Sequence, residues 1–258
     1  MNPEKLKAKK SLGQNFLKDE AVLKRIIESA NLSVDDVVIE IGPGEGAMTE
    51  LLVGKCKKVI AIELDDRLIE VLHTKFVGNE SSHSPAGEGG VEIIHGDILK
   101  INLPKLIEEN ELVESGYKVI ANIPYYITAP IIRLLLETKY SPKEALLMVQ
   151  KEVAERIVAK KGAMSILAIS VQYYSEAKFL FTVFAQSFDP KPKVDSAIIR
   201  ITRNMELGAQ NAEEVKKFFR TVKAGFSAKR KTLINNLSSS LQLDKKEIEE
   251  KLGSKLMT

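Results

Sequence analysis

The sequence predicts an α/β protein in which helices cover a largely parallel sheet, followed by a small helical domain. Between positions 19 and 203, short apolar runs rich in β-branched residues alternate with helix-like stretches, which is typical of parallel sheets flanked by helices. Beyond position 203 the β-branched runs stop and helix formers with spaced apolar residues take over. The length of 258 residues suits one large domain with a smaller appendage.

The elements of the main domain follow one another in a regular order. A basic arm over residues 1–18 precedes a helix predicted over 19–31, for which Asp19 can serve as the N-cap. Residues 78–90 are polar and glycine-rich, which predicts a loop between a helix and the third strand. Apolar runs predict strands at 37–41, 59–62, 91–94, 119–121 and 145–149.

A second pattern closes the main domain near position 203. Residues 179–201 read as a strand, a proline-bearing loop and a strand, with Val194, Ala197, Ile199 and Ile201 as candidates for a hairpin that completes the sheet. Residues 204–258 then form the small helical domain, whose apolar positions include Phe218 and Phe219. We therefore expect an arm (1–18), a sheet domain (19–203) and a helical domain (204–258).

Composition excludes several classes of protein. Hydrophobic residues make up 44% of the chain and charged residues 28%, and no apolar run approaches the roughly 18 residues that a membrane span requires. The N-terminus is basic and lacks the apolar stretch of a secretory signal, so we expect a soluble protein of the cytoplasm. Cys56 is the only cysteine, which excludes an internal disulfide and any multi-cysteine zinc site. No metal is expected.

A glycine-rich turn follows the first predicted strand. Gly42, Gly44 and Gly46 alternate in the segment GPGEG, and such a turn lets the backbone approach a ligand closely. The G-x-G-x-G spacing differs from the G-x-G-x-x-G that seats a pyrophosphate. Glu63 closes the second strand, where a carboxylate can accept hydrogen bonds from both hydroxyls of a ribose. The pattern favours an adenosine-bearing cofactor.

The third strand ends in a further candidate. Asp97 can accept a hydrogen bond from an adenine amino group, while Ile98 packs on the ring. The alternative is that the glycines form only a tight turn and that Glu63 and Asp97 are helix caps. The adenosine interpretation is favoured because three successive strand ends present suitable residues at the edge where open α/β sheets bind ligands.

The fourth strand ends in Asn122, Ile123, Pro124 and Tyr125, the most specific short motif of the chain. The amine of adenine is a poor nucleophile because its lone pair is delocalised into the ring. The Asn122 side-chain oxygen and the Ile123 carbonyl can each accept one amine hydrogen and localise that pair. Pro124 stiffens the turn, and the Tyr125 ring can hold an extruded base. Phe188 can supply a second aromatic wall, although a lone phenylalanine is more often a core residue; its flanking prolines and lysines favour an exposed loop. The alternative for the motif itself is a plain strand-ending turn.

These residues resemble a known family, the rRNA adenine N6,N6-dimethyltransferases of the 16S type. The resemblance covers roughly residues 7–240 and rests on blocks at 10–17 (KSLGQNFL), 40–46 (EIGPGEG), 61–64 (AIEL), 122–130 (NIPYYITAP), 148–156 (MVQKEVAER), 188–196 (FDPKPKVDS) and 225–237 (GFSAKRKTLINNL). It implies a Rossmann-like class I sheet that uses S-adenosyl-L-methionine. Its substrate would be two adjacent adenosines in a hairpin near the 3′ end of 16S rRNA, dimethylated on N6 within an immature small ribosomal subunit.

The resemblance also adds the N-terminal arm to the cofactor site. The candidate cofactor-binding residues are then Asn15, Leu17, Gly42, Gly44, Glu63, Leu64, Asp97, Ile98 and Asn122. Two features depart from the family pattern, because the loop over 78–90 is long and the chain ends at Thr258, earlier than most bacterial members. We expect these departures to affect recognition of the particle, not the cofactor or catalytic blocks.

Basic residues near the C-terminus are candidates for contacts with RNA. Residues 213–231 carry a local charge of +5, against +3 for the whole chain. Lys229, Arg230 and Lys231 suit RNA phosphates, and Lys191 and Lys193 can extend the same surface; a solvated helix face is the alternative. Rival functions are a 23S rRNA adenine methyltransferase of the macrolide-resistance type, a non-catalytic RNA-binding assembly or transcription factor, and a small-molecule methyltransferase. We expect the free protein to be a monomer.

Overall fold

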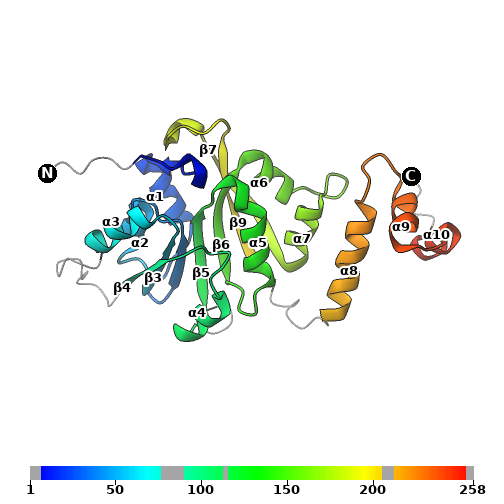
Figure 1. Cartoon of the computed structure of the whole chain (residues 1–258), viewed down its shortest axis with the longest axis horizontal. Coiled ribbons are helices and arrows are strands. Elements are labelled where there is room, and N and C mark those ends of the chain that lie inside the picture. Colours follow the sequence, from blue (N-terminus) through cyan, green and yellow to red (C-terminus); the bar gives the residue numbers. More distant parts are fainter. Residues whose placement is uncertain (1–6, 77–89, 113–115, 205–211, 254–258) are drawn as a thin grey trace.

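A seven-stranded mixed sheet forms the centre of the molecule (Figure 1). The computed structural model describes residues 7–76, 90–112, 116–204 and 212–253. The strand order is β4-β3-β2-β5-β6-β9-β7. Its strands are β2 (Val37–Ile41), β3 (Lys58–Glu63), β4 (Gly90–His95), β5 (Tyr117–Asn122), β6 (Glu144–Gln150), β7 (Ser175–Val183) and β9 (Ser196–Arg203). The first five are parallel to one another, and β9 pairs antiparallel with both β6 and β7.

All five strands that the apolar runs predicted are present, as is the hairpin that completes the sheet. Ala197, Ile199 and Ile201 are buried in β9 as expected. Val194 is not part of the hairpin: it lies before β9 and is 46% exposed, because the proline-bearing loop extends to Asp195. The predicted loop over 78–90 lies outside the described residues except for Gly90, which begins β4.

Helices cover the two faces of the sheet with separate hydrophobic cores. Successive side chains of a strand point to opposite faces, so Ile39 and Ile41 join one core and Val38 the other. The first core packs against α4 (Leu103–Glu109), α5 (Thr128–Glu137), α6 (Lys151–Ile157) and α7 (Ile166–Tyr174). The second packs against α1 (Glu20–Ser29) and α2 (Ala47–Leu52), while α3 (Asp66–Phe76) contacts β3 and β4. No described helix is long and apolar enough to span a bilayer.

The N-terminal arm is tied to the far end of the sheet domain. After the short 3₁₀ helix η1 (Lys10–Leu12), strand β1 (Phe16–Leu17) pairs antiparallel with β8 (Phe188–Asp189). Asp19 then caps α1 as predicted, because its Oδ1 accepts hydrogen bonds from the backbone N–H groups of Ala21 and Val22 at 3.1 and 3.2 Å. Its Oδ2 accepts a hydrogen bond from Ser187 Oγ at 2.9 Å, which joins the start of α1 to the segment before β8.

Three helices follow the sheet: α8 (Ala212–Gly225), α9 (Leu233–Leu241) and α10 (Lys245–Leu252). Their small core consists of Ala224, Leu237 and Ile248. Phe218 and Phe219 face the main domain instead, where Phe218 stacks on Tyr173 with ring centroids 4.5 Å apart and Phe219 stacks on Tyr174 at 5.8 Å. These stacked rings join α8 to α7.

Candidate active site

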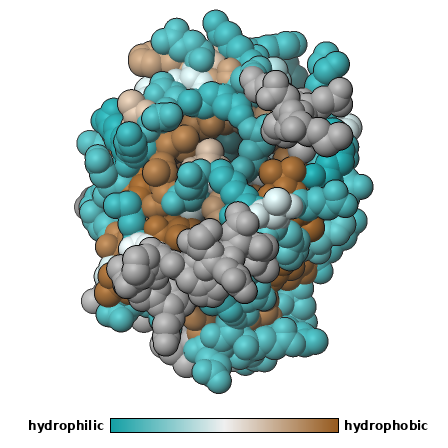
Figure 2. Space-filling model, turned by 90° about the vertical axis from the view of Figure 1, so that its left-hand side faces the viewer, coloured by the Kyte–Doolittle hydropathy of each residue, from teal (hydrophilic) through white to brown (hydrophobic). Residues whose placement is uncertain are grey.

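The ends of β2, β3, β4 and β5 meet at one edge of the sheet and open onto a cavity with two adjoining parts. The empty volume is about 830 Å³ in the larger part and about 560 Å³ in the smaller. The larger part is lined by residues at or just beyond the end of each of the four strands, among them Gly42, Glu63, Asp97 and Asn122. It also includes Gly44, Leu64, Ile98, Ile123, Pro124, Tyr125 and Phe188. Seen from the side on which α3 lies, apolar surface gathers in a hollow that hydrophilic residues frame (Figure 2).

The glycines of this turn are required for different structural reasons. All adopt a left-handed backbone conformation, with φ of +71° at Gly42, +60° at Gly44 and +79° at Gly46, which disfavours other residues. A Cβ at Gly46 would lie 2.5 Å from the Phe76 ring, so this glycine is required by packing. A Cβ at Gly42 would meet only the Asn122 carbonyl, at 3.7 Å, and would project into open space at the cavity wall. Gly42 is therefore the position that keeps room for a ligand.

Glu63 is buried, not a solvated cap, and its carboxylate organises the turn. Oε1 accepts hydrogen bonds from the backbone N–H groups of Leu64 and Asp65, both at 2.8 Å, and Oε2 accepts one from Gly44 at 3.1 Å. Burial raises the pKa of this carboxyl group. Since a carboxylate offers about four acceptor positions, one remains for a ribose hydroxyl. A second hydroxyl would have to replace the Gly44 contact.

Asp97 and Ile98 line the same cavity after β4, the strand next to β3. Asp97 Oδ1 accepts a hydrogen bond from the backbone N–H of Leu99 at 3.0 Å, while Oδ2 lies 3.8 Å from Lys100 Nζ. The carboxylate thus closes a local turn and keeps acceptor capacity on Oδ2. Ile98 is 5% exposed and Leu64 is 43% exposed, so apolar side chains flank the polar positions.

Asn122 occupies the central position of the edge, between the turn after β2 and the arm. Its Nδ2 donates a hydrogen bond to the Asn15 carbonyl at 3.2 Å, which fixes the amide with Nδ2 towards the arm. Within the described chain, Oδ1 accepts no hydrogen bond. The orientation therefore leaves an acceptor for an amine, as the chemistry of the motif requires. Ile123 follows with its backbone N–H bound to the Met148 carbonyl at 3.3 Å.

Tyr125 and Phe188 form aromatic walls, but each is held more tightly than the sequence indicated. The Tyr125 hydroxyl lies 2.8 Å from Ser196 Oγ, and burial raises its pKa. Phe188 is 6% exposed, so the expectation that it lies in an exposed loop is wrong. The reason is its pairing with Leu17 across the β1–β8 ladder, which draws this end of the loop under the arm.

Local sequence patterns missed a polar network that anchors the arm. The Asp65 side chain is fully buried and accepts hydrogen bonds from Arg67 Nη2 at 2.6 Å, Lys9 Nζ at 2.8 Å and Gln14 Nε2 at 2.9 Å. Hydrogen bonds from these donors, of which that from Arg67 has the largest effect, lower the pKa of Asp65. Asn15 lies between Gln14 and β1, so the network positions the arm residue that contacts Asn122. The only sequence signal was the basic, polar character of the arm.

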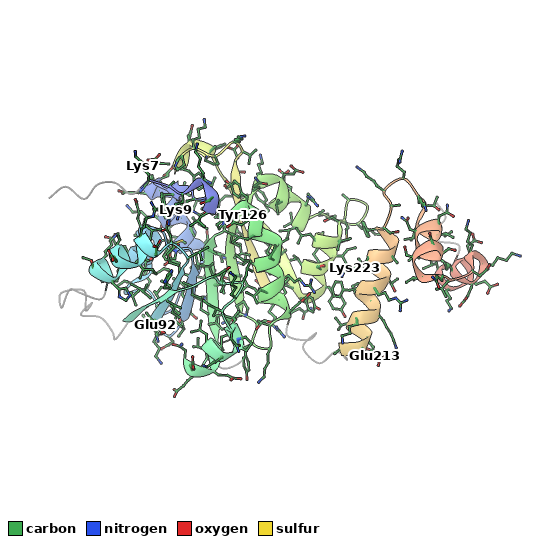
Figure 3. The ribbon with its side chains drawn as sticks, in the orientation of Figure 1. Lys7, Lys9, Glu92, Tyr126, Glu213 and Lys223 are labelled. Atoms are coloured by element: carbon green, nitrogen blue, oxygen red, sulfur yellow. The ribbon has the colours of Figure 1, made fainter. Side chains whose placement is uncertain are left out.

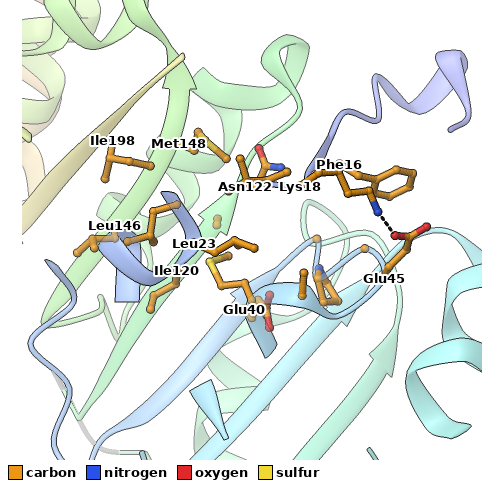
Figure 4. A pocket seen from close by; sticks show the side chains of 18 residues that line it. Phe16, Lys18, Leu23, Glu40, Glu45, Ile120, Asn122, Leu146, Met148 and Ile198 are labelled. Carbon is orange, nitrogen blue, oxygen red and sulfur yellow. Dashed lines mark hydrogen bonds and ion pairs between the residues drawn. The ribbon is translucent and has the colours of Figure 1, made fainter. Parts of the chain in front are cut away.

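A second part of the cavity lies beneath the arm (Figure 4). Leu17 lines this part and not the part beside Glu63. An ion pair between Lys18 and Glu45 lies at one side, as Figure 4 shows. Glu40 is fully buried in its wall: Thr49 Oγ1 donates to Oε2 at 2.6 Å, whereas Oε1 has no hydrogen-bond partner among the residues that the structure describes. Burial raises the pKa of Glu40 to about 7. Glu40 is not among the site residues predicted from the sequence.

The predicted RNA-contact residues are exposed but do not form one surface. Lys191 and Lys193 lie in the loop before β9, and residues 229–231 lie between α8 and α9. Figure 1 shows these two loops on the same side of the molecule but well separated.

An open groove between the sheet domain and α8 contains a different set of cations. Its basic lining residues are Arg133, Arg156, Arg203, Lys216, Arg220 and Lys223. The three on α8 are spaced by four and three residues and so share one helix face, and Figure 3 shows Lys223 on the side towards the sheet domain. The groove reaches Tyr125. These cations of α8 are not among the RNA-contact residues predicted from the sequence, because the part of the molecule that they face depends on how α8 packs.

Sheet order, glycine turn, ribose-binding carboxylate position and Asn-x-Pro-Tyr corner together define a class I methyltransferase that depends on S-adenosyl-L-methionine. The residues fit that cofactor, since open acceptors at Glu63, Asp97 and Asn122 and the space at Gly42 line one cavity. The family model described as "Ribosomal RNA adenine dimethylase" matches residues 5–255. The chain belongs to this family.

Named relatives and solved structures agree. A ribosomal RNA small subunit methyltransferase A of Dehalococcoides mccartyi is 42% identical over 240 residues, which cover 93% of this chain and 78% of the relative. A dimethyladenosine transferase from Plasmodium falciparum has a similar structure, with a TM-score of 0.73, 30% identity, and 88% of this chain and 77% of that chain covered. The 23S rRNA methyltransferase ErmE gives a TM-score of 0.71 at 29% identity, covering 92% and 88%.

Proposed function

We propose that this chain transfers methyl groups from S-adenosyl-L-methionine to the N6 amines of two adjacent adenosines in a hairpin near the 3′ end of 16S rRNA. The substrate is the immature small ribosomal subunit, so methylation is coupled to its assembly. The enzyme acts in the cytoplasm and is a monomer when free. Residues 1–18 form an arm over the cofactor, 19–203 the catalytic domain and 204–258 an RNA-binding domain.

The observation that carries this proposal is the open acceptor on Asn122 at the edge of the cofactor cavity. Its amide is oriented by the hydrogen bond to Asn15, so Oδ1 is available to an amine without a change of rotamer. When bound, the cofactor supplies an electrophilic methyl group on a sulfonium. Asn122 Oδ1 and the Ile123 carbonyl each accept one N6 hydrogen, which draws the nitrogen towards tetrahedral geometry and localises its lone pair. Methylation itself acidifies the amine, so no strong general base is required.

The aromatic walls serve to hold an extruded base. An enzyme that modifies a base takes it out of its stack and binds it between apolar or aromatic side chains. Tyr125 and Phe188 line the same cavity as Asn122, and the Ser196 contact and the β1–β8 pairing fix their positions. We assign both to the binding pocket of the target adenine.

Binding of the cofactor uses the strand ends and the arm together. Glu63 accepts a ribose hydroxyl, Asp97 accepts from the adenine amine, and Leu64 and Ile98 cover the ring. Gly42 and Gly44 admit the ligand, while Asn15 and Leu17 close over it from the arm. The Asp65 network supports this assignment because it fixes the arm beside Asn122.

RNA contacts come from two places. The groove cations on α8 face the catalytic corner and suit the phosphates of a strand that leads into it. Residues Lys191, Lys193, Lys229, Arg230 and Lys231 lie farther out on exposed loops and suit more distant phosphates of the particle.

The decisive experiment is methyl transfer from labelled cofactor to unmethylated small or large subunits, with the modified bases mapped. We expect two dimethylated adenosines near the 3′ end of 16S rRNA. Label in 23S rRNA alone would support the macrolide-resistance reading, and no label in either subunit would support a non-catalytic factor. Asn122→Ala is the matched control: it should retain cofactor affinity and lose most turnover, and full activity would contradict the proposed chemistry.

A further inference from the structure

Tyr126 is a second aromatic residue at the catalytic corner, with surroundings unlike those of Tyr125. It lies in the 3₁₀ helix η3 (Tyr125–Ile127), directly after Pro124, and is 60% exposed. Figure 3 shows it beside the N-terminal arm. A Cβ at Gly13 would lie 3.3 Å from Tyr126 Cε1, so the absence of a side chain there leaves room for the ring. No hydrogen bond to the Tyr126 hydroxyl occurs within the described residues.

The position of Tyr126 joins two regions that the substrate must occupy together. Its side chain lines both the cofactor cavity and the basic groove that runs to α8. Tyr125 lines both as well, but its hydroxyl is held by Ser196 and its ring is partly buried. Tyr126 is thus the more exposed of the two rings at the junction of the cavity and the groove, which we call the mouth of the cavity.

An exposed ring at this point answers a specific need of the substrate. When one adenosine is extruded into the pocket, the next base loses a stacking partner at the mouth of the cavity. An aromatic side chain can replace that partner for any base, because every base has a π face. The neighbouring phosphates would then lie towards the groove, where the cations of α8 are found.

We propose that Tyr126 stacks on the nucleotide adjacent to the adenosine being methylated, and so holds the second adenosine at the mouth of the pocket. This inference rests on the proposed function, since it takes an rRNA strand with adjacent target adenosines as the substrate. Tyr126 is a substrate-binding residue at the junction of the cofactor cavity and the groove. Its ring, not its hydroxyl, is the group that acts.

The test compares Tyr126→Ala and Tyr126→Phe with the unmodified full chain on unmethylated small subunits. Loss of one base–aromatic stack corresponds to about a 5- to 160-fold effect on binding, so Tyr126→Ala should raise KM for particles by that factor and leave kcat within about threefold. Tyr126→Phe should stay within about twofold of the unmodified protein, because the ring is retained. Phe184→Ala is the matched control, since Phe184 is 58% exposed and lines neither the cavity nor the groove.

Several outcomes would overturn the assignment. A KM for Tyr126→Ala equal to that of the unmodified protein would show that the ring does not stack on the substrate. A rise in KM for Tyr126→Phe as large as that for Tyr126→Ala would show that the hydroxyl, not the ring, binds the substrate. A loss confined to kcat would place the ring against the target base. Weaker cofactor binding by calorimetry in Tyr126→Ala, matching its loss in kcat/KM, would mean that the ring acts through the arm. Failure of the proposed function itself is distinct, because the unmodified protein would then transfer no methyl to these particles.

Discussion

Replacing the buried Glu40 by glutamine should change how stability depends on pH. The pKa of Glu40 is raised to about 7 from its ordinary value of 4.5, chiefly because the side chain is fully buried, and the nearby Glu63 carboxylate adds to the rise. Between these two values the native state keeps the proton while the unfolded chain releases it. Stability must therefore fall as pH rises through this window and level off above about pH 7.

The size of the effect follows from the displacement of the pKa. Each unit is worth about 1.4 kcal/mol, so ionisation of Glu40 costs the folded state about 3 kcal/mol above pH 7. Between about pH 5 and pH 8 the loss is about 2 to 3 kcal/mol. Glutamine retains the shape and can still accept the Thr49 hydrogen bond, but it does not ionise. Any fixed cost of its buried amide is the same at both pH values and cancels in the comparison.

The assay is denaturant unfolding of both proteins without cofactor at about pH 5 and about pH 8. The stability of Glu40→Gln relative to the unmodified protein should rise by about 2 to 3 kcal/mol between the two conditions. Glu50→Gln, on α2 with a side chain 64% exposed, should show no comparable change. A Glu40→Gln difference that is the same at both pH values would refute the inference that the carboxyl group is buried and protonated.

Three further predictions concern ligand binding. Glu63→Ala should weaken cofactor affinity measured by calorimetry, and an unchanged value would remove the ribose contact. Asp65→Asn removes a carboxylate that accepts hydrogen bonds from three side chains. The variant should bind the cofactor more weakly, because the arm is less firmly held, and its arm should be cleaved faster by protease. Unchanged cofactor affinity and an unchanged cleavage rate would show that the network does not hold the arm. Alanine at residues 229–231 should reduce the slope of log affinity for RNA against log salt by about 2 to 3. An unaltered slope would show that these residues are a solvated surface that does not contact RNA.

Most of the sheet and its edge were predictable because the signals are local. β-Branched runs give the strands, and parallel strands bring their carboxyl ends to one edge. It follows that Gly42, Glu63, Asp97 and Asn122 meet although they are spread over 81 positions of the chain. The helix cap at Asp19 was predictable for the same reason, since its partners lie two and three residues away.

Other features depend on contacts that local patterns do not encode. Phe188 is buried because its backbone pairs with Leu17, more than 170 positions earlier in the sequence. The residues beside Asp65 in the sequence do not distinguish it from a surface carboxylate, because Lys9 and Gln14, which bind it, are more than 50 positions away. Phe218 and Phe219 of α8 face the main domain because they stack on tyrosines of α7. Their spacing in the sequence predicted a helix but not the helix against which it packs.

The same long-range contacts explain why the arm belongs to the site. Cofactor chemistry requires the four strand ends, but the orientation of the Asn122 amide comes from Asn15 in the arm. That arm is held at one side by Asp65, two residues after Glu63, and at the other by β8, which contains Phe188. A ligand that contacts the strand ends and the arm together stabilises the docked arm by mass action. In the proposed mechanism, cofactor binding and the orientation of the Asn122 amide are therefore linked through the arm, which precedes the sheet in sequence and contacts the end of β5 in space.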